Sequence, residues 1–135
     1  MNIIIGGLAA LLYLFAGGLL ALRLAHTGSG IVRPKGGPLA LGGGAVLLHA
    51  IILAQTVLQP VGLNLGFCNA LSFTGWLISV VLLAAALIRP VENLGILVLP
   101  FAALTLMLGV LFPAERIVAD VGQWPLELHI FIAIL

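Results

Sequence analysis

Charged side chains are scarce in this sequence. Of its 135 residues, 7% are Asp, Glu, Lys or Arg, whereas 63% are hydrophobic. A soluble domain has about a quarter of its residues charged, and so little polar sequence cannot cover the exterior of a water-soluble globule. The composition therefore excludes a soluble enzyme with a conventional core and indicates an integral membrane protein that is surrounded by lipid.

Basic residues and cysteines are also few. The chain has five Lys and Arg residues and a formal net charge of +1. Non-specific nucleic-acid binding depends on many Lys and Arg side chains that neutralise phosphates, so nucleic acid is not an expected partner. Cys68 is the single cysteine, which excludes an internal disulfide and argues against thiol redox chemistry within the chain. We expect Cys68 to be a small apolar residue at a helix entrance.

Long apolar runs dominate the rest of the sequence. Four of them, each about the length of one spanning helix, extend over Ile3 to Leu24, Leu39 to Leu58, Leu71 to Ile88 and Leu94 to Phe112. A fifth begins near Pro125 and is too short to cross a bilayer. The sequence predicts an all-α, polytopic transmembrane bundle, with four spanning helices plus the start of a fifth. We expect residues 1–135 to be a single transmembrane domain and the amino-terminal part of a longer protein.

The basic residues predict the orientation of the bundle. Arg23, Arg33, Lys35 and Arg89 fall on one side of the membrane, and Arg116 falls on the other. Because Lys and Arg are enriched on the cytoplasmic side, the amino terminus is expected outside. The fifth helix then begins at the outer face, with Trp124 at the interface where indole rings are common.

Small residues recur within the runs. We expect them, Gly17-Gly18 and Gly42-Gly43-Gly44 among them, to let helix backbones approach closely. If their role is to dock partner helices, bulky replacements at Gly17 or Gly43 would be harmful. Pro100 within the fourth run is expected to kink its helix or to loosen one turn.

His49 is the most conspicuous residue within the apolar runs. It lies about ten residues into the second run, which places it roughly 15 Å deep. Intramembrane ionisable residues usually face the bundle interior and mark a pathway, a cofactor or a buried pair. The alternative is a neutral histidine that is hydrogen-bonded to a neighbouring helix. Gln55, Asn69 and Ser72 are candidate hydrogen-bond partners for the propionates of a haem or for one another, although helix capping explains Asn69 and Ser72 equally well.

His129 lies near the start of the fifth run, about 6 Å below the outer surface. Glu127 is two residues away and so on a different helix face, which argues against an intrahelical pair. Two neutral imidazoles in a helical bundle can ligate a haem iron axially, whereas zinc would need three or four ligands. His49 and His129 are therefore candidate axial ligands, on one iron or at separate sites. His26 is expected to be solvated.

The sequence resembles the cytochrome c assembly protein family, in its CcsA-like, YpjD-type branch. The residues that carry the resemblance are Leu48-His49-Ala50, Asn69-Ala70-Leu71-Ser72, Leu97-Val98-Leu99-Pro100, and Trp124 ahead of Leu128-His129-Ile130. The last of these resembles the histidine-bearing helix start at which the shared assembly domain of the family begins.

The resemblance implies a protein of the bacterial inner membrane with about eight helices in its full length, each of about 20 residues. It implies haem b as cofactor, and haem binding or export for cytochrome c maturation outside the membrane. Its implied partners are haem, apocytochrome c, other cytochrome c assembly subunits and membrane lipid. His129 matches the motif histidine and His49 matches a histidine of the amino-terminal region. An enzymatic activity of its own is not expected, apart from a share in haem attachment.

Two other functions remain open on the sequence. The chain can be a haem-independent transporter or permease component that uses His49 as a proton or substrate relay. It can also be a structural membrane assembly subunit whose small-residue faces dock partner helices.

Overall fold

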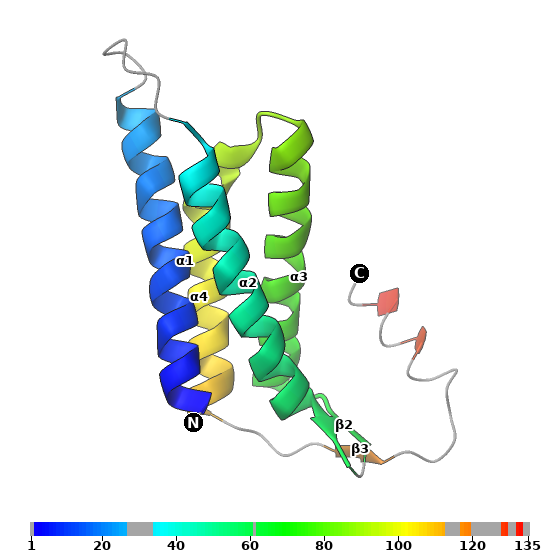
Figure 1. Ribbon diagram of the computed structural model, residues 1–135. Coiled ribbons are helices and arrows are strands. Elements are labelled where there is room, and N and C mark those ends of the chain that lie inside the picture. Colours follow the sequence, from blue (N-terminus) through cyan, green and yellow to red (C-terminus); the bar gives the residue numbers. More distant parts are fainter. Residues whose placement is uncertain are drawn as a thin grey trace.

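The structure is a computed structural model that describes residues 2–26, 34–60, 62–112, 117–119, 128–129 and 132–133. Four long helices make up most of it: α1 (Asn2–Ala25), α2 (Gly36–Val57), α3 (Phe67–Ile88) and α4 (Gly95–Leu111) (Figure 1). The 3-10 helix η2 (Glu92–Leu94) leads directly into α4. These four helices, with η2 counted as part of the fourth, are long and apolar enough to cross a membrane. The predicted all-α bundle is confirmed, and the chain is a multi-pass membrane protein.

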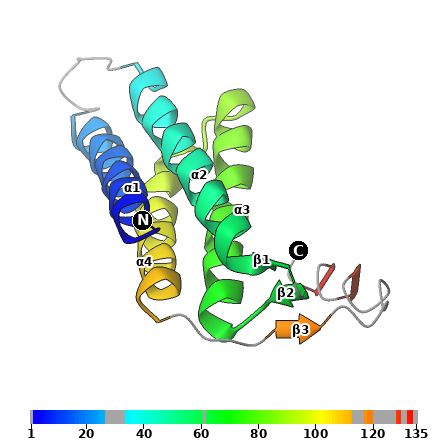
Figure 2. The ribbon, with the colours of Figure 1, turned by 60° about the horizontal axis from the view of Figure 1, so that its bottom comes forward.

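The helices form a ring in which each contacts the next. α1 packs extensively against α2 and α4, and α4 packs against α3, while α2 and α3 make the least extensive contact of the four pairs. Figure 2 shows α1 and α3 on opposite sides of the bundle. The bundle is therefore tightest around α1 and α4 and most open between α2 and α3.

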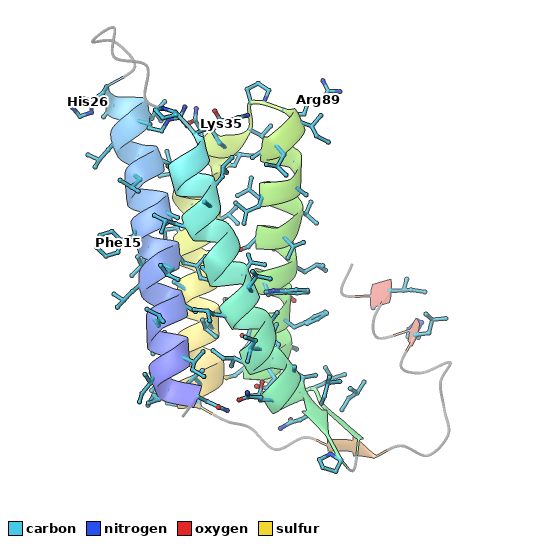
Figure 3. All side chains as sticks on the ribbon, viewed as in Figure 1. Phe15, His26, Lys35 and Arg89 are labelled. Atoms are coloured by element: carbon cyan, nitrogen blue, oxygen red, sulfur yellow. The ribbon has the colours of Figure 1, made fainter. Side chains whose placement is uncertain are left out.

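The interior of the bundle is rich in small side chains, and many large apolar side chains point outward. The buried positions Ala9, Tyr13, Ala16 and Leu20 of α1 are three or four residues apart, which places them on one helix face. They join residues of α2 and α4 in one core cluster. Phe15, by contrast, is 65% exposed and points away from the bundle (Figure 3). In a membrane, small interior residues let helices approach while large outward ones face lipid.

A small antiparallel sheet forms at one end of the bundle, where the sequence predicts only loops. Its strands are β1 (Leu58–Gln59), β2 (Gly62–Asn64) and β3 (Ile117–Ala119). β2 is central, with Leu63 opposite Leu58 on one side and opposite Val118 on the other. Gly62 has a φ of 139°, which residues with a Cβ rarely adopt. Strands of two or three residues are too short to show the alternation by which a sequence predicts strands.

The other end of the bundle carries described basic residues. His26, Lys35 and Arg89 lie together at that end (Figure 3). Lys35 Nζ donates to the carbonyl oxygen of Ala86 at 2.9 Å, so the start of α2 is tied to the last turn of α3, where a cation is favoured by the helix dipole.

A second contact at the basic end joins α1 to the connection before α4. Arg23 Nη1 lies 3.8 Å from Glu92 Oε1. With Lys35 and Arg89, Arg23 makes up the described part of the basic group that the sequence predicts on one side of the membrane. Arg33 and Arg116 lie outside the described residues.

Pro100 lies within α4, and the helix runs past it without a break. A proline in a helix removes one backbone hydrogen bond and crowds the preceding turn. α1 makes room for its ring at Gly17, where an added Cβ would lie 3.2 Å from Pro100 Cδ. Gly17 is therefore a close-packing position, as predicted. Gly43 is not, because an added Cβ there would meet nothing within 4 Å.

The fifth run is described in part. Leu128, His129, Ile132 and Ala133 are helical. The predicted interfacial position of Trp124 and the predicted helix start near Pro125 lie outside the described residues, as does Glu127.

Helices α3 and α4 are in close contact at Gly75. A Cβ added to Gly75 would overlap Thr105 Oγ1 on α4. Gly109 of α4 packs in a similar way on α3, since its added Cβ would lie 3.2 Å from Ser72 Cβ. The contact between α3 and α4 therefore requires positions without a side chain.

We expect Gly75→Leu to lower the stability of the bundle, because overpacking of this kind costs about 1–3 kcal/mol. Gly43→Leu is the matched control and should change stability by less than about 0.5 kcal/mol. Thermal unfolding of both variants in mild detergent, followed by circular dichroism, measures the difference. Equal melting temperatures for the two variants would contradict the close contact of α3 with α4.

Candidate functional site

His49 is fully enclosed in the middle of the bundle. Its side chain has an exposed fraction of 0%, and it projects from the interior face of α2, which also carries Gly42, Ala45 and Ile52. A histidine at this depth is costly in lipid unless its polar atoms are satisfied by protein. His49 therefore lies in the interior of the bundle, as predicted.

Both ring nitrogens of His49 have protein partners. Nδ1 lies 3.2 Å from the hydroxyl oxygen of Tyr13 on α1, and Nε2 lies 2.9 Å from Ser72 Oγ on α3. The rings of Tyr13 and His49 meet edge to face, with centroids 5.9 Å apart and an interplanar angle of 81°. The imidazole therefore joins three helices through two hydrogen bonds.

The two hydrogen bonds are compatible with either neutral tautomer of His49. In one, the Tyr13 hydroxyl donates to Nδ1 and the Nε2 hydrogen is donated to Ser72 Oγ. In the other, the Nδ1 hydrogen is donated to the Tyr13 hydroxyl oxygen, and the Ser72 hydroxyl donates to Nε2. Both forms are possible because a hydroxyl can donate or accept. A neutral ring is thus satisfied at both nitrogens in either form, which is the alternative that the sequence left open for His49.

Further buried polar residues of α3 extend this cluster. Ser79 is fully buried and donates from Oγ to the carbonyl oxygen of Gly75 at 2.9 Å. Asn69 Nδ2 donates to the carbonyl oxygen of Asn64 at 3.2 Å. Asn69, Ser72 and Ser79 are all at least nine-tenths buried, and their spacing places them on one helix face.

The polar face of α3 covers only part of the bundle's length. It begins beside the sheet, where Asn64 closes β2, and extends to Ser79. Beyond Ser79, toward the basic end, the buried positions of α3 are Leu82 and Ala86. The buried face of α3 is therefore polar from the sheet past His49 to Ser79 and apolar from there toward the basic end.

Asn69 and Ser72 do not cap α3. The helix begins at Phe67 after Gly66, and no side chain caps its first turn. Both residues lie inside the helix, where their polar atoms bond to Asn64 and His49. Capping therefore explains neither residue, and the bond of Ser72 to His49 is one that the sequence did not predict.

The other polar residues singled out from the sequence lie away from the His49 ring. Gln55 is exposed and bonds to neither His49 nitrogen. His26 is exposed, and its Nδ1 lies 2.7 Å from the carbonyl oxygen of Leu22. Trp76 is half-buried and donates from Nε1 to the carbonyl oxygen of Val46 at 3.0 Å. Cys68 is a free, half-buried thiol in the first turn of α3.

Tyr13 and Ser79 are members of this cluster that sequence reasoning missed. Tyr13 is the single tyrosine of the chain and lies in the middle of an apolar run. Because a buried tyrosine hydroxyl usually finds a partner, its position was a signal of an interior polar contact. The identity of its partner, His49, depends on how α1 is rotated against α2. The sequence of one helix does not determine that rotation.

His129 lies in a different environment. It is exposed, as are Leu128, Ile132 and Ala133 around it. The structure does not bring His129 and His49 together, because the His49 ring is enclosed by residues of α1, α2 and α3. Among the described residues, no three His, Cys, Asp or Glu side chains gather to hold a metal ion.

The contact between Ser72 and His49 has the geometry of a hydroxyl and its general base. Acyl transfer would also require a substrate carbonyl beside Ser72 Oγ. Ser72 is 3% exposed and His49 is 0% exposed, so no substrate reaches the pair in this arrangement. What the cluster can do is hold helices together and pass a proton between neighbouring hydrogen-bonding groups.

Comparison with known proteins identifies no relative: no family model, no curated protein and no solved structure matches the chain.

We expect the His49 hydrogen bonds to contribute measurably to stability. Side-chain hydrogen bonds between membrane helices are worth about 0.6 kcal/mol on average and up to about 1.7 kcal/mol. Ser72→Ala and His49→Leu, alone and together, should give a coupling free energy of that size when unfolding is measured by denaturing-detergent titration. Thr74→Val is the matched control, because Thr74 donates within its own helix and should not couple to His49. Coupling of the same size for both pairs would contradict the assignment.

Proposed function

We propose that this chain is the amino-terminal module of a haem-handling membrane protein that serves cytochrome c assembly. The observation that carries the proposal is an exposed histidine, His129, in an apolar helical segment outside a four-helix membrane bundle. The sequence resemblance supports the same proposal, because His129 matches the motif histidine of the cytochrome c assembly family. Haem binding or export for cytochrome c maturation is a function consistent with both the exposed histidine and the resemblance.

His129 fits the role of an axial ligand. Its imidazole is exposed, and its neighbours Leu128 and Ile132 are 48% and 61% exposed apolar side chains. A haem presents a broad apolar face and takes an imidazole nitrogen on its iron. The residues around His129 therefore offer a nitrogen together with apolar surface for the macrocycle.

His49 fits the same role less well. Both of its nitrogens are hydrogen-bonded to protein, so ligation of an iron would require Tyr13 or Ser72 to give up its bond. We assign haem contact to His129 first, and we assign to His49 the joining of α1, α2 and α3. An iron shared by the two histidines would need both a free His49 nitrogen and a path to it through buried residues.

The basic residues support an orientation for this role. Lys35 and Arg89 lie at the end of the bundle opposite the sheet (Figure 3), and the positive-inside rule puts them in the cytoplasm. The amino terminus and the sheet are then outside the bacterial inner membrane. Apocytochrome c and other assembly subunits are the proposed partners there, with haem as the bound cofactor, in the b form.

Haem binding is tested by oxidised and dithionite-reduced absorption spectra of the native-length protein purified in mild detergent. We expect the spectrum of a haem b with a histidine ligand. His129→Ala should reduce copurifying haem by about tenfold or more, since even the loss of a residue that only supports a ligand costs about 10–100-fold in affinity.

The matched control for this test is His26→Ala, which removes an exposed histidine at the basic end of the bundle and should leave the haem content unchanged. A colourless protein that also fails to take up added haem would contradict the proposal. Unchanged haem in His129→Ala would contradict the assignment of the ligand.

A second candidate function is favoured by the polar cluster itself. His49 lies between two hydroxyl groups at mid-membrane depth, which is the arrangement of a proton relay in a haem-independent transporter or permease. In that case Tyr13→Phe and Ser72→Ala would each interrupt proton transfer at one side of the ring.

Reconstituted vesicles distinguish the two functions. If the chain handles haem, an imposed pH gradient should drive no more proton flux through wild-type vesicles than through His49→Gln vesicles, measured with an enclosed pH-sensitive dye. Proton flux that survives removal of haem and is lost in His49→Gln would favour the transporter.

A further inference from the structure

An apolar groove runs along the surface of the bundle where α2 and α3 separate. Its volume is about 230 Å³. Its lining is Ala50, Leu53, Ala54 and Val57 of α2, Leu58 of β1, and Phe73 and Trp76 of α3. It follows the pair of neighbouring helices that contact each other least.

The two walls of the groove differ. On α3, Phe73 and Trp76 lie with ring centroids 5.9 Å apart, and the Trp76 indole is held by its hydrogen bond to the Val46 carbonyl. On α2, Ala50 and Ala54 have little side chain. Small residues of this kind let another helix backbone approach closely in a membrane. The groove is therefore suited to binding a helix.

We propose that this groove receives the helical segment of this same chain that carries Leu128 and Ile132. The two residues are four apart, so they project from one side of a helix. Both are exposed in the structure, and no polar side chain of the groove's lining would be left unsatisfied by their packing.

The sheet brings this segment to the correct end of the groove. β3 comes after α4 in the chain, yet it pairs with β2 rather than remaining beside α4. β2 leads into α3, and β1 extends from Val57 at the end of the groove. The nine residue steps from Ala119 to Leu128 can reach up to about 30 Å, which is ample for the chain to turn back into the membrane at this end.

The described residues of the segment already lie on this side of the molecule. In Figures 1 and 2 they lie beyond α3, on the side of the bundle away from α1. The spacing also agrees: Leu128 and Ile132 are four residues apart, or about 6 Å along a helix, which fits within the roughly 10 Å from Ala50 to Val57 along α2.

Docking in the groove would give His129 a fixed position near the sheet end of α2 and α3. This inference does not depend on haem binding, because it concerns only apolar packing within the chain. Failure of the haem experiment would therefore leave it standing, and its own failure would leave haem binding untouched.

Cysteine cross-linking in native membranes tests the docking. In the Cys68→Ser background of the native-length chain, Ala54→Cys is combined with Ile132→Cys and oxidised with copper phenanthroline. A disulfide needs Cα atoms within about 7 Å, so docking predicts an intramolecular disulfide. It is scored as loss of both thiols to a maleimide-polyethylene glycol gel shift.

The matched control replaces Ala54→Cys by Leu14→Cys, on an exposed part of α1. Because docking holds only the groove pair within the reach of a disulfide, we expect cross-linking on the order of tenfold higher for that pair than for the control. Equal yields for both pairs would overturn the proposal. A cross-linked dimer in place of the intramolecular product would also overturn it and would make a second copy the occupant.

A groove-filling variant provides the second test. Ala50→Phe should fill the groove and lower the cross-linking yield of the Ala54→Cys and Ile132→Cys pair severalfold. Ala84→Phe, at an exposed position of α3 outside the groove, is its control and should leave the yield unchanged. An unchanged yield in Ala50→Phe would overturn the proposal even if the first experiment gives a cross-link.

Discussion

The His49 imidazole, buried inside a bundle of four helices that can span a membrane, is the constraint on which the rest of the bundle depends. Hydrocarbon offers no water to satisfy its nitrogens, and each unsatisfied polar group there costs several kcal/mol. Tyr13 of α1 and Ser72 of α3 satisfy both, which fixes how these two helices are rotated against α2. Gly109 then matters because it lets α4 pack on α3 beside Ser72. One polar residue thereby sets the arrangement of a mostly apolar bundle.

The two ends of the bundle have different chemistry, and the proposed function uses that difference. At the basic end, Lys35 and Arg23 tie the connections together by polar contacts. At the other end, three short strands gather the connection after α2 and the chain after α4. The apolar groove opens at this second end, and so does the route to His129. A haem-handling role outside the membrane needs the iron ligand, His129, at the sheet end. The buried His49 cluster holds the helices together.

The four helices could be predicted because apolar runs of spanning length are a signal within each segment. The start of α3 was predicted four residues late, at Leu71 instead of Phe67, because Asn69 and Ser72 are polar and resemble the end of a loop. Their partners, Asn64 and His49, are separated from them by five and 23 residues. The pairing of β2 with β3 is similarly non-local. Contacts of this kind depend on helix rotation and chain return, which composition and periodicity do not encode.

The most direct test of the division between the two histidines is nitrogen-15 NMR of histidine-labelled protein in lipid bilayers, with and without reduced haem that is made diamagnetic by bound carbon monoxide. The account predicts that haem shifts the His129 ring nitrogens to values of an iron-bound imidazole and leaves those of His49 at their neutral, hydrogen-bonded values. A haem-dependent shift at His49, or unchanged His129 nitrogens in a protein that has bound haem, would contradict it.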